Sequence, residues 1–266
     1  MAKQTRSRLM LALAGLLSAG WLQTALAADG TAGGAAQADD SWHFTVGPEF
    51  GATSFKGNGA VGGAAGSFKL PFHKVAKDTR VAFAGGVIAT RGPLGLWLNG
   101  QYLNLKQDFD SGEHHGSARG HATELSAGAW YQVWDRKLGG QTVHGTAQQI
   151  TLAPLAGVRW TGLNAAVDAG HESDSQSASW AIPFAGARLS ADLSPHWLVS
   201  AQADAGAWGR DFTTQGQVTA GYRMMLMGLP AVVHAGYQVL HQDHKTDDFH
   251  WNVTQYGPMA GLSVTF

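Results

Sequence analysis

The chain has 266 residues, 14% of them charged, and a formal net charge of −1. This near-neutral balance argues against a nucleic-acid partner, which would require a basic face. The sequence has no cysteine, which excludes disulfides and thiolate metal sites. Ten Trp, eleven Phe and 36 Gly in so polar a chain are typical of strands with one lipid face and one wet face.

Residues 1–27 have the pattern of a cleaved signal peptide. A positively charged start is followed by an apolar run over residues 9–22 and by the cleavage motif Ala25-Leu26-Ala27. An uncleaved membrane anchor is the alternative, but the apolar run is shorter than the roughly 20 residues that a helical span needs. Residues 28–40 are small and polar, and we expect a flexible periplasmic lead-in there. The folded domain should therefore cover residues 41–266.

From residue 41 onward the apolar side chains recur with a period of two. In residues 42–50, for example, most even positions are apolar and most odd positions are polar or Gly. Successive side chains of a strand point to opposite faces, so each such segment predicts a strand with one apolar and one polar face. Ten segments are long enough to span a membrane: 42–55, 79–91, 94–107, 121–134, 148–162, 178–191, 196–209, 213–226, 230–243 and 250–266.

The connections between these segments alternate in length. Short ones fall near 91–94, 192–196 and 227–229, and longer polar ones fall at 108–118, 162–177 and 243–249. Membrane barrels have this asymmetry, with short periplasmic turns and longer outer loops. The pattern predicts an all-β fold, an antiparallel transmembrane up-and-down β-barrel of about ten strands. Eight or twelve strands are the alternatives.

Residues 56–78 fit the alternation less well. The Gly-rich part, 57–66, is compatible with a short strand, and residues 68–77 are compatible with a helical turn.

A soluble β-sandwich would give the same alternation, because its inner face is apolar and its outer face polar. Two features argue against it. The predicted strands run to about a dozen residues, which is longer than the usual strand of soluble sheets. Their polar faces are rich in Gly, Gln, Ser and Thr rather than in Lys and Glu.

The last predicted strand carries a possible sorting signal. Gly261, Val264 and Phe266 have the spacing of the outer-membrane β-signal, which the barrel-assembly machinery reads, although Met259 stands where that signal usually has a polar residue. The mature chain also resembles a family of poorly characterised proteobacterial outer-membrane β-barrel proteins. The resembling segments are residues 46–50, 157–160, 183–188, 203–209, 221–223, 236–238 and 256–262.

This resemblance implies a fold and a location in the outer membrane, and it implies no known reaction. Family members often have Arg where this chain has Gln238 and an acidic residue where it has Ile182. Those departures argue against an interior charge network shared with the family.

The polar faces predict a lumen that contains both signs of charge. Three acidic residues and three arginines from different strands should point inward: Glu49, Glu124, Asp204, Arg159, Arg188 and Arg223. Arg and carboxylate form bidentate pairs that are stronger where water is scarce. The set predicts either a salt-bridged plug or a pore constriction with charge selectivity. The limited bore of a ten-stranded barrel favours the plug or a very narrow passage.

Two predicted outer loops combine His with acidic residues. The sets are Asp108, Asp110, Glu113, His114 and His115, and His241, Asp243, His244, Asp247 and Asp248. Such residues can bind divalent cations, but no strict metal-binding spacing is present, so we expect no specific metal site and no cofactor. The loop motif His171-Glu172-Ser173-Asp174-Ser175 contains the residue types of a hydrolase, but adjacent loop residues do not establish a triad. We therefore expect no enzymatic activity.

Seven Trp residues lie near predicted strand ends, where aromatic residues form girdles at the membrane interfaces. Trp130 should be the exception, because its parity places it in the lumen. The seven are Trp42, Trp130, Trp134, Trp160, Trp180, Trp197 and Trp251.

Together these patterns predict a monomeric barrel in the bacterial outer membrane, in contact with lipid and lipopolysaccharide. Its expected role is structural, or that of a narrow channel for small polar solutes. The alternatives are a surface interaction or adhesion protein that acts through the loops at 108–118 and 162–177, and a lipid-modifying enzyme at the rim. The sequence leaves open which solute, if any, would pass.

Overall fold

The computed structural model describes residues 41–61, 64–73, 79–111, 114–168, 173–247 and 249–266. The predicted signal peptide and lead-in lie outside these residues. Strands account for most of the described chain. They are β1 (His43–Gly51), β2 (Ser54–Val61), β3 (Ala64–Leu70), β4 (Thr79–Arg91), β5 (Leu94–Ser111), β6 (His114–Tyr131), β7 (Trp134–Gln141), β8 (Ala147–Asp168), β9 (Ser173–Asp192), β10 (Trp197–Trp208), β11 (Asp211–Leu226), β12 (Leu229–Lys245) and β13 (Phe249–Thr265).

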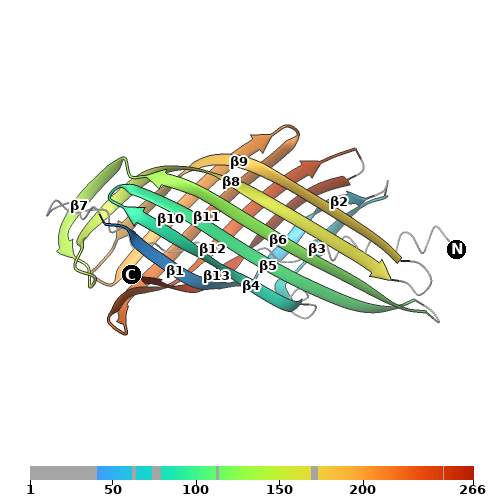
Figure 1. The fold of residues 1–266 in the computed structure, drawn as a ribbon, viewed down its shortest axis with the longest axis horizontal. Coiled ribbons are helices and arrows are strands. Elements are labelled where there is room, and N and C mark those ends of the chain that lie inside the picture. Colours follow the sequence, from blue (N-terminus) through green and yellow to red (C-terminus); the bar gives the residue numbers. More distant parts are fainter. Residues whose placement is uncertain (1–40, 62–63, 74–78, 112–113, 169–172, 248) are drawn as a thin grey trace.

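Ten of the described strands form a closed antiparallel barrel (Figure 1). Their order around the wall is β1-β4-β5-β6-β8-β9-β10-β11-β12-β13, and β13 returns to β1. Thr45 stands opposite Thr265 at this closure, and Phe44 and Phe266 exchange two backbone hydrogen bonds of 2.8 and 2.9 Å. The prediction of a ten-stranded barrel is confirmed.

Two different strands, β1 and β2, pair with the same edge of β13. β1 pairs with residues 259–265 of β13, whereas β2 pairs with residues 249–256 of the same strand. β2 then forms a hairpin with β3, and β4 returns beside β1. The single short strand considered for 57–66 is wrong, because this segment contains the end of β2 and the start of β3. The helical turn expected over 68–77 is wrong at its start, because residues 68–70 pair with β2 as part of β3, and residues 74–78 lie outside the described residues.

The strand β7 was not expected from the sequence. It continues the course of β6 along β8, so that Trp134 stands opposite Leu152 just beyond the pair Trp130 and Leu155. Since β5 begins at Leu94, opposite Tyr131, β7 and the start of β8 extend the barrel wall on one side only (Figure 1).

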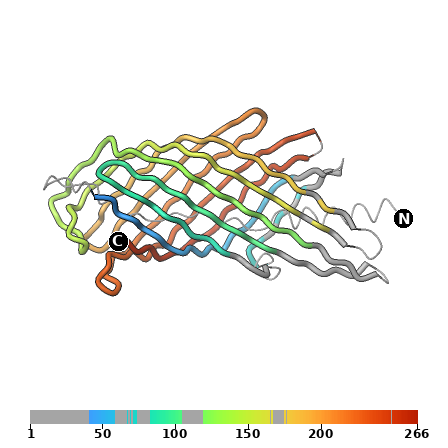
Figure 2. Tube along the Cα trace, in the orientation of Figure 1, coloured from blue at the N-terminus to red at the C-terminus, as the bar shows by residue number. Residues whose placement is uncertain are grey.

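The two ends of the barrel differ, but the prediction of long polar outer loops is wrong, because the segments 108–118, 162–177 and 243–249 belong mostly to strands. Turns of two to four residues connect β4 to β5, β9 to β10 and β11 to β12. The last of these has positive φ at both central positions, 51° at Met227 and 85° at Gly228, which is typical of the two-residue turns that suit twisted hairpins. At the other end the strands run further than expected. Thus β5 and β6 pair as far as Ser111 and His114, and β8 and β9 as far as Asp168 and Ser173. The course of the strands along the barrel can be followed in the Cα trace (Figure 2).

The outer wall of the barrel is apolar across its middle. Large side chains exposed there include Phe44, Phe50, Leu98, Leu125, Val158, Leu189, Val218, Val233 and Val239. Trp42, Trp134, Trp160 and Trp197 are also 37–50% exposed, as expected of girdle residues. A soluble sandwich would bury such a surface, because contiguous apolar patches of this size are rare on soluble monomers. No helix in the described residues has the length and apolarity needed to cross a membrane.

Candidate functional site: the barrel interior

Arg159 lies at the centre of the most extensive polar cluster in the interior. Its guanidinium donates to Asp204 Oδ1 at 3.1 Å, to Thr213 Oγ1 at 2.7 Å and to the side-chain oxygen of Gln215. Arg159 Nε also lies 3.8 Å from Glu124 Oε1. The Arg and both carboxylates have side chains at most 3% exposed. A buried charge is costly unless it is paired and hydrogen-bonded, and Arg159 meets that requirement with partners from the three strands β6, β10 and β11.

A contact between Gln242 and Glu124 extends this cluster across the whole lumen. Gln242 on β12 donates to Glu124 Oε2 on β6 at 3.4 Å and to Thr161 Oγ1 on β8 at 3.2 Å. In the order around the wall, β6 and β12 are five positions apart in a ring of ten, so they face each other across the barrel. Side chains therefore bridge the full width of the interior at this level.

Glu49 pairs with a histidine rather than with an arginine. His234 Nε2 lies 3.1 Å from Glu49 Oε1, and neither side chain is exposed. The register places Gly261 of β13 directly between them, opposite Glu49 on one side and His234 on the other. A Cβ added at Gly261 would lie 2.7 Å from the His234 ring and 2.8 Å from Glu49 Cγ. The absence of a side chain at Gly261 thus lets the pair meet across β13.

Arg223 forms the centre of a cluster at the end with short turns. Its Nη2 lies 2.6 Å from Asp192 Oδ1, and Asp192 Oδ2 accepts the backbone N–H of Gln149 at 2.8 Å. The backbone N–H of Arg223 also donates to His196 O in the turn between β9 and β10.

The turn between β7 and β8 reaches this cluster. Val143 N–H donates to Pro195 O at 3.1 Å, and His144 Nε2 donates to Met224 O at 3.0 Å. Thr142, at the start of the turn, is 5% exposed. The turn therefore connects the extended part of the wall to the turn after β9 and to β11.

Arg188 faces an aromatic ring rather than a carboxylate. Its guanidinium carbon lies 5.4 Å from the centre of the Trp130 ring, and Trp130 stacks on Trp97 with ring centres 5.7 Å apart. Phe184 packs against Trp97 on one side and lies under Arg159 at 4.5 Å on the other. These rings fill the space between the two arginines, each of which gains a cation–π contact. The prediction that Trp130 faces the lumen is confirmed.

Toward the end with long hairpins the interior contains a further aromatic layer. Trp180 stacks on His244 with ring centres 4.3 Å apart and an angle of 8° between the planes, and Phe249 packs against both. His244 Nδ1 donates to Asp211 Oδ1 at 2.8 Å. Trp180 is 6% exposed and Trp251 is 2% exposed, so the expectation that these two belong to an interfacial girdle is wrong.

The interior as a whole is less polar than the alternation predicted. Inward positions also hold Leu155, Leu163, Ile182, Leu240 and Met259, each at most 5% exposed. All six charged residues predicted to face inward do so, but they are distributed among several clusters. Only Arg159, Glu124 and Asp204 come together. The sequence reasoning missed Asp192, His234, Gln215 and Gln242. All four share the inward parity of their strands and could have been found from it, although Asp192 lies one residue beyond the expected end of its strand.

The His-containing segments do not form a metal site in the described residues. Among these residues no group of three or more His, Cys, Asp or Glu side chains is placed to hold a metal ion. His244 points into the lumen, whereas Asp243 accepts hydrogen bonds from His250 at 3.2 Å and from Asn252 at 2.9 Å on the outer wall. Glu113, Asp248, His171 and Glu172 lie outside the described residues, as do the side chains of the loop positions 108–115.

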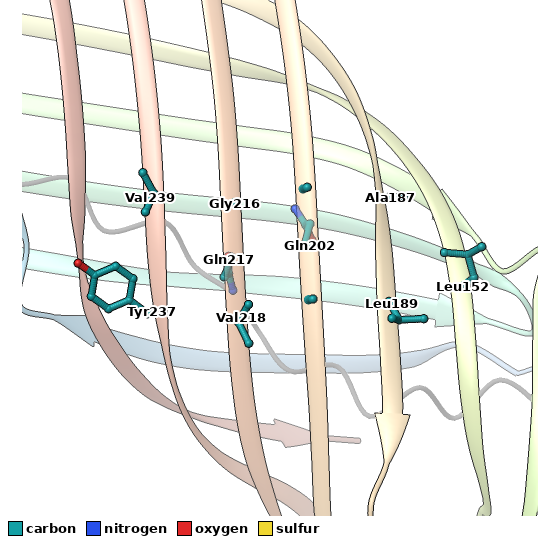
Figure 3. Close-up of a pocket in the computed structure, with 11 residues that line it drawn as sticks. Leu152, Ala187, Leu189, Gln202, Gly216, Gln217, Val218, Tyr237 and Val239 are labelled. Carbon is teal, nitrogen blue, oxygen red and sulfur yellow. The ribbon is translucent and has the colours of Figure 1, made fainter.

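A groove crosses the outer wall over β8 to β12 (Figure 3). Its floor is formed by small residues, among them Ala187, Ala201 and Ala203, and taller apolar side chains such as Leu189, Val218 and Val239 line it. These positions have the outward parity of their strands, so the groove belongs to the apolar outer surface and not to the lumen.

The comparisons with known proteins show a likeness in fold alone. No protein-family model matches the sequence, and no curated protein matches it. Among solved structures, the outer-membrane protease OmpT from Escherichia coli has 11% identity and a TM-score of 0.41, over 86% of this chain and 98% of that one. The transport unit of the autotransporter AIDA-I from Escherichia coli has 12% identity and a TM-score of 0.39, over 98% of both chains. The attachment invasion locus protein Ail of Yersinia pestis has 12% identity and a TM-score of 0.35, over 85% and 99%.

Proposed function

We propose that this protein is a barrel of the bacterial outer membrane whose interior is sealed, and that it acts as a structural scaffold rather than as a diffusion pore. The apolar outer wall supports the location, because such a surface is stable in lipid and not in water. The distance along β10, about a dozen residues at roughly 3.3 Å each, also matches an apolar band of about 25 Å once strand tilt is included.

The bridge from Gln242 to Glu124 is the observation that carries the proposal of a sealed interior. It crosses the lumen at its full width, and Arg159 attaches the same carboxylate to β10 and β11 through Asp204 and Gln215. Aromatic layers lie on both sides of this polar layer. A hydrated ion would have to break several buried hydrogen bonds to pass, which favours the scaffold over the narrow channel.

Current through planar lipid bilayers tests this proposal. The mature protein should give no steady conductance steps, whereas the double variant Arg159→Ala, Gln242→Ala should give steps that grow with salt concentration. The exposed Arg210→Ala is the matched control and should stay silent, because Arg210 is 59% exposed at the rim. Discrete, salt-dependent steps from the unaltered protein would overturn the sealed interior. Recovery of the mature protein as a water-soluble monomer without detergent would overturn the membrane location.

A second candidate, a surface interaction protein, is favoured by the length of the hairpin that β8 and β9 form. On β8 the last large apolar outward residue is Trp160, and the strand continues for eight residues to Asp168. On β9 the outward positions beyond Ala181 are serines, including Ser175, Ser177 and Ser179. Paired strands that project roughly 25 Å along their length beyond the apolar band offer a rigid surface outside the cell. Removal of residues 166–175 should abolish attachment to host cells or matrix if this candidate holds, and unchanged attachment would exclude it.

A further inference from the structure

Two lysines stand side by side on the outer wall of the β2–β3 hairpin. The register places Lys56 of β2 directly opposite Lys69 of β3, and both side chains are exposed. Residues opposite each other on antiparallel strands have Cβ atoms about 5 Å apart and point to the same face, and like charges in this arrangement are destabilising. Neither lysine forms an ion pair with a carboxylate of the described residues. The arrangement therefore leaves a concentrated positive charge that an anion would stabilise.

The two lysines belong to a row of residues that stand opposite one another on neighbouring strands, and polar residues on β13 and β12 continue this row. Thr254 stands opposite Lys56 on its other side, and His241 stands opposite Thr254. His241 Nδ1 lies 3.0 Å from Thr254 Oγ1, an arrangement that fixes the orientation of both side chains. The row thus combines two ammonium groups with a hydroxyl and an imidazole, all of which can contact phosphate oxygens.

This row lies directly above the apolar part of the wall. The next outward pair on β12 and β13 toward the membrane is Val239 and Tyr256, and the outward positions beyond the row are Asp243 and Asn252. Both strands thus change from apolar to polar at the same level, the position expected for the boundary between lipid chains and headgroups. The flexible four-carbon stems of Lys56 and Lys69 let their ammonium groups reach down to that boundary.

We propose that Lys56 and Lys69, with Thr254 and His241 beside them, form a binding site for the phosphate group of a lipid in the outer leaflet. The proposal rests on the membrane location proposed above. Anionic lipid headgroups attract basic residues placed at the membrane surface, and Lys binds phosphate as a point charge. A phosphate between the two lysines would replace their mutual repulsion by two attractive contacts.

Native mass spectrometry of the mature protein in detergent tests this site. The probes are lipid A that carries its phosphates, the same lipid A after enzymatic dephosphorylation, and inorganic phosphate. The unaltered protein should retain the phosphorylated lipid about tenfold more tightly than the dephosphorylated one, a ratio typical of a lost charged contact. Lys56→Ala, Lys69→Ala should remove that preference. Lys137→Ala is the matched control, because Lys137 is an exposed lysine at the opposite end of the barrel, and it should keep the preference.

Equal retention of the two lipids by the unaltered protein, or an unchanged preference in the double variant, would overturn the site. Inorganic phosphate that binds as tightly as the lipid would overturn the assignment to a lipid headgroup. Failure of the protein to enter detergent micelles would instead contradict the proposed membrane location. The reversed-charge variant Lys69→Glu adds a second readout. It should slow amide exchange in the β2–β3 hairpin in phosphate-free detergent, because the repulsion between positions 56 and 69 becomes an attraction. The same variant should weaken retention of phosphorylated lipid. A faster exchange in that variant would mean that the lysines do not repel each other.

Discussion

The two arginine clusters of the interior illustrate different ways to hold a buried charge. Arg159 lies midway along the lumen and joins strands that are separated around the wall, from β6 to β11. Arg223 lies at the end with short turns and joins Asp192 to elements near that end. The first cluster is enclosed by aromatic layers, whereas the second lies beside the turns after β7 and β9. The comparison indicates that Arg159 joins the wall across the middle of the lumen, whereas Arg223 joins elements at one end of the barrel.

The largest expected effect follows from removing Arg159. Arg159→Met should lower the free energy of unfolding by about 3–5 kcal/mol, because Glu124 and Asp204 would stay buried beside each other without a cation. The midpoint of urea unfolding in detergent micelles measures the change. A loss below about 1 kcal/mol would mean that water already reaches the cluster.

Arg223→Met should have a smaller effect, a loss of about 2 kcal/mol, since water can reach Asp192 once the end of the barrel relaxes. The same unfolding measurement applies, with Arg210→Met as the exposed control. A loss equal to that of Arg159→Met would erase the distinction between the two clusters.

Gly261→Ala tests the third buried pair, which is local to the closure between β13 and β1. The added methyl should push His234 and Glu49 apart and cost about 1–3 kcal/mol, as overpacking does. Gly216→Ala is the matched control within a strand, because a Cβ there meets nothing within 4 Å. Equal stability of the two variants would show that the pair can move aside without cost.

His144→Ala should have the smallest effect, a loss of about 1 kcal/mol or less from one hydrogen bond to Met224 O. Hydrogen exchange of the Val143 and Thr142 amides should become faster, while the strands keep their protection. Unchanged exchange would mean that the turn is held by its backbone contacts alone.

The wall of the barrel could be predicted from the sequence because alternation is a local signal. The six inward charges that were predicted followed from their parity, as Arg159 and Asp204 show. Their pairing did not follow, because it depends on which strands face each other once the sheet closes. The position of Trp180 and Trp251 was predicted wrongly for a related reason. β9 begins five residues before its expected start, so Trp180 lies inside a longer barrel. β13 begins within one residue of its expected start, and Trp251 has the inward parity of that strand.

The strand β7 and the turn after it show a second limit. Residues 134–141 mix Trp, charged residues and Gly, so their alternation is weak, and only the pairing with β8 makes them a strand. The partner of Glu49 was missed because a histidine was not counted among the charged residues. The position of Gly261 between the two strands was readable only from the register.

The bridge between Glu124 and Gln242 also bears on how the chain assembles. These residues are 118 positions apart in sequence, and the strands that carry them never become neighbours in the wall. Each pair of adjacent strands can form from local contacts. The bond between Glu124 and Gln242 can form only when the sheet closes and its opposite sides come together. We therefore expect this bond to form late in assembly, once the opposite sides of the sheet have come together.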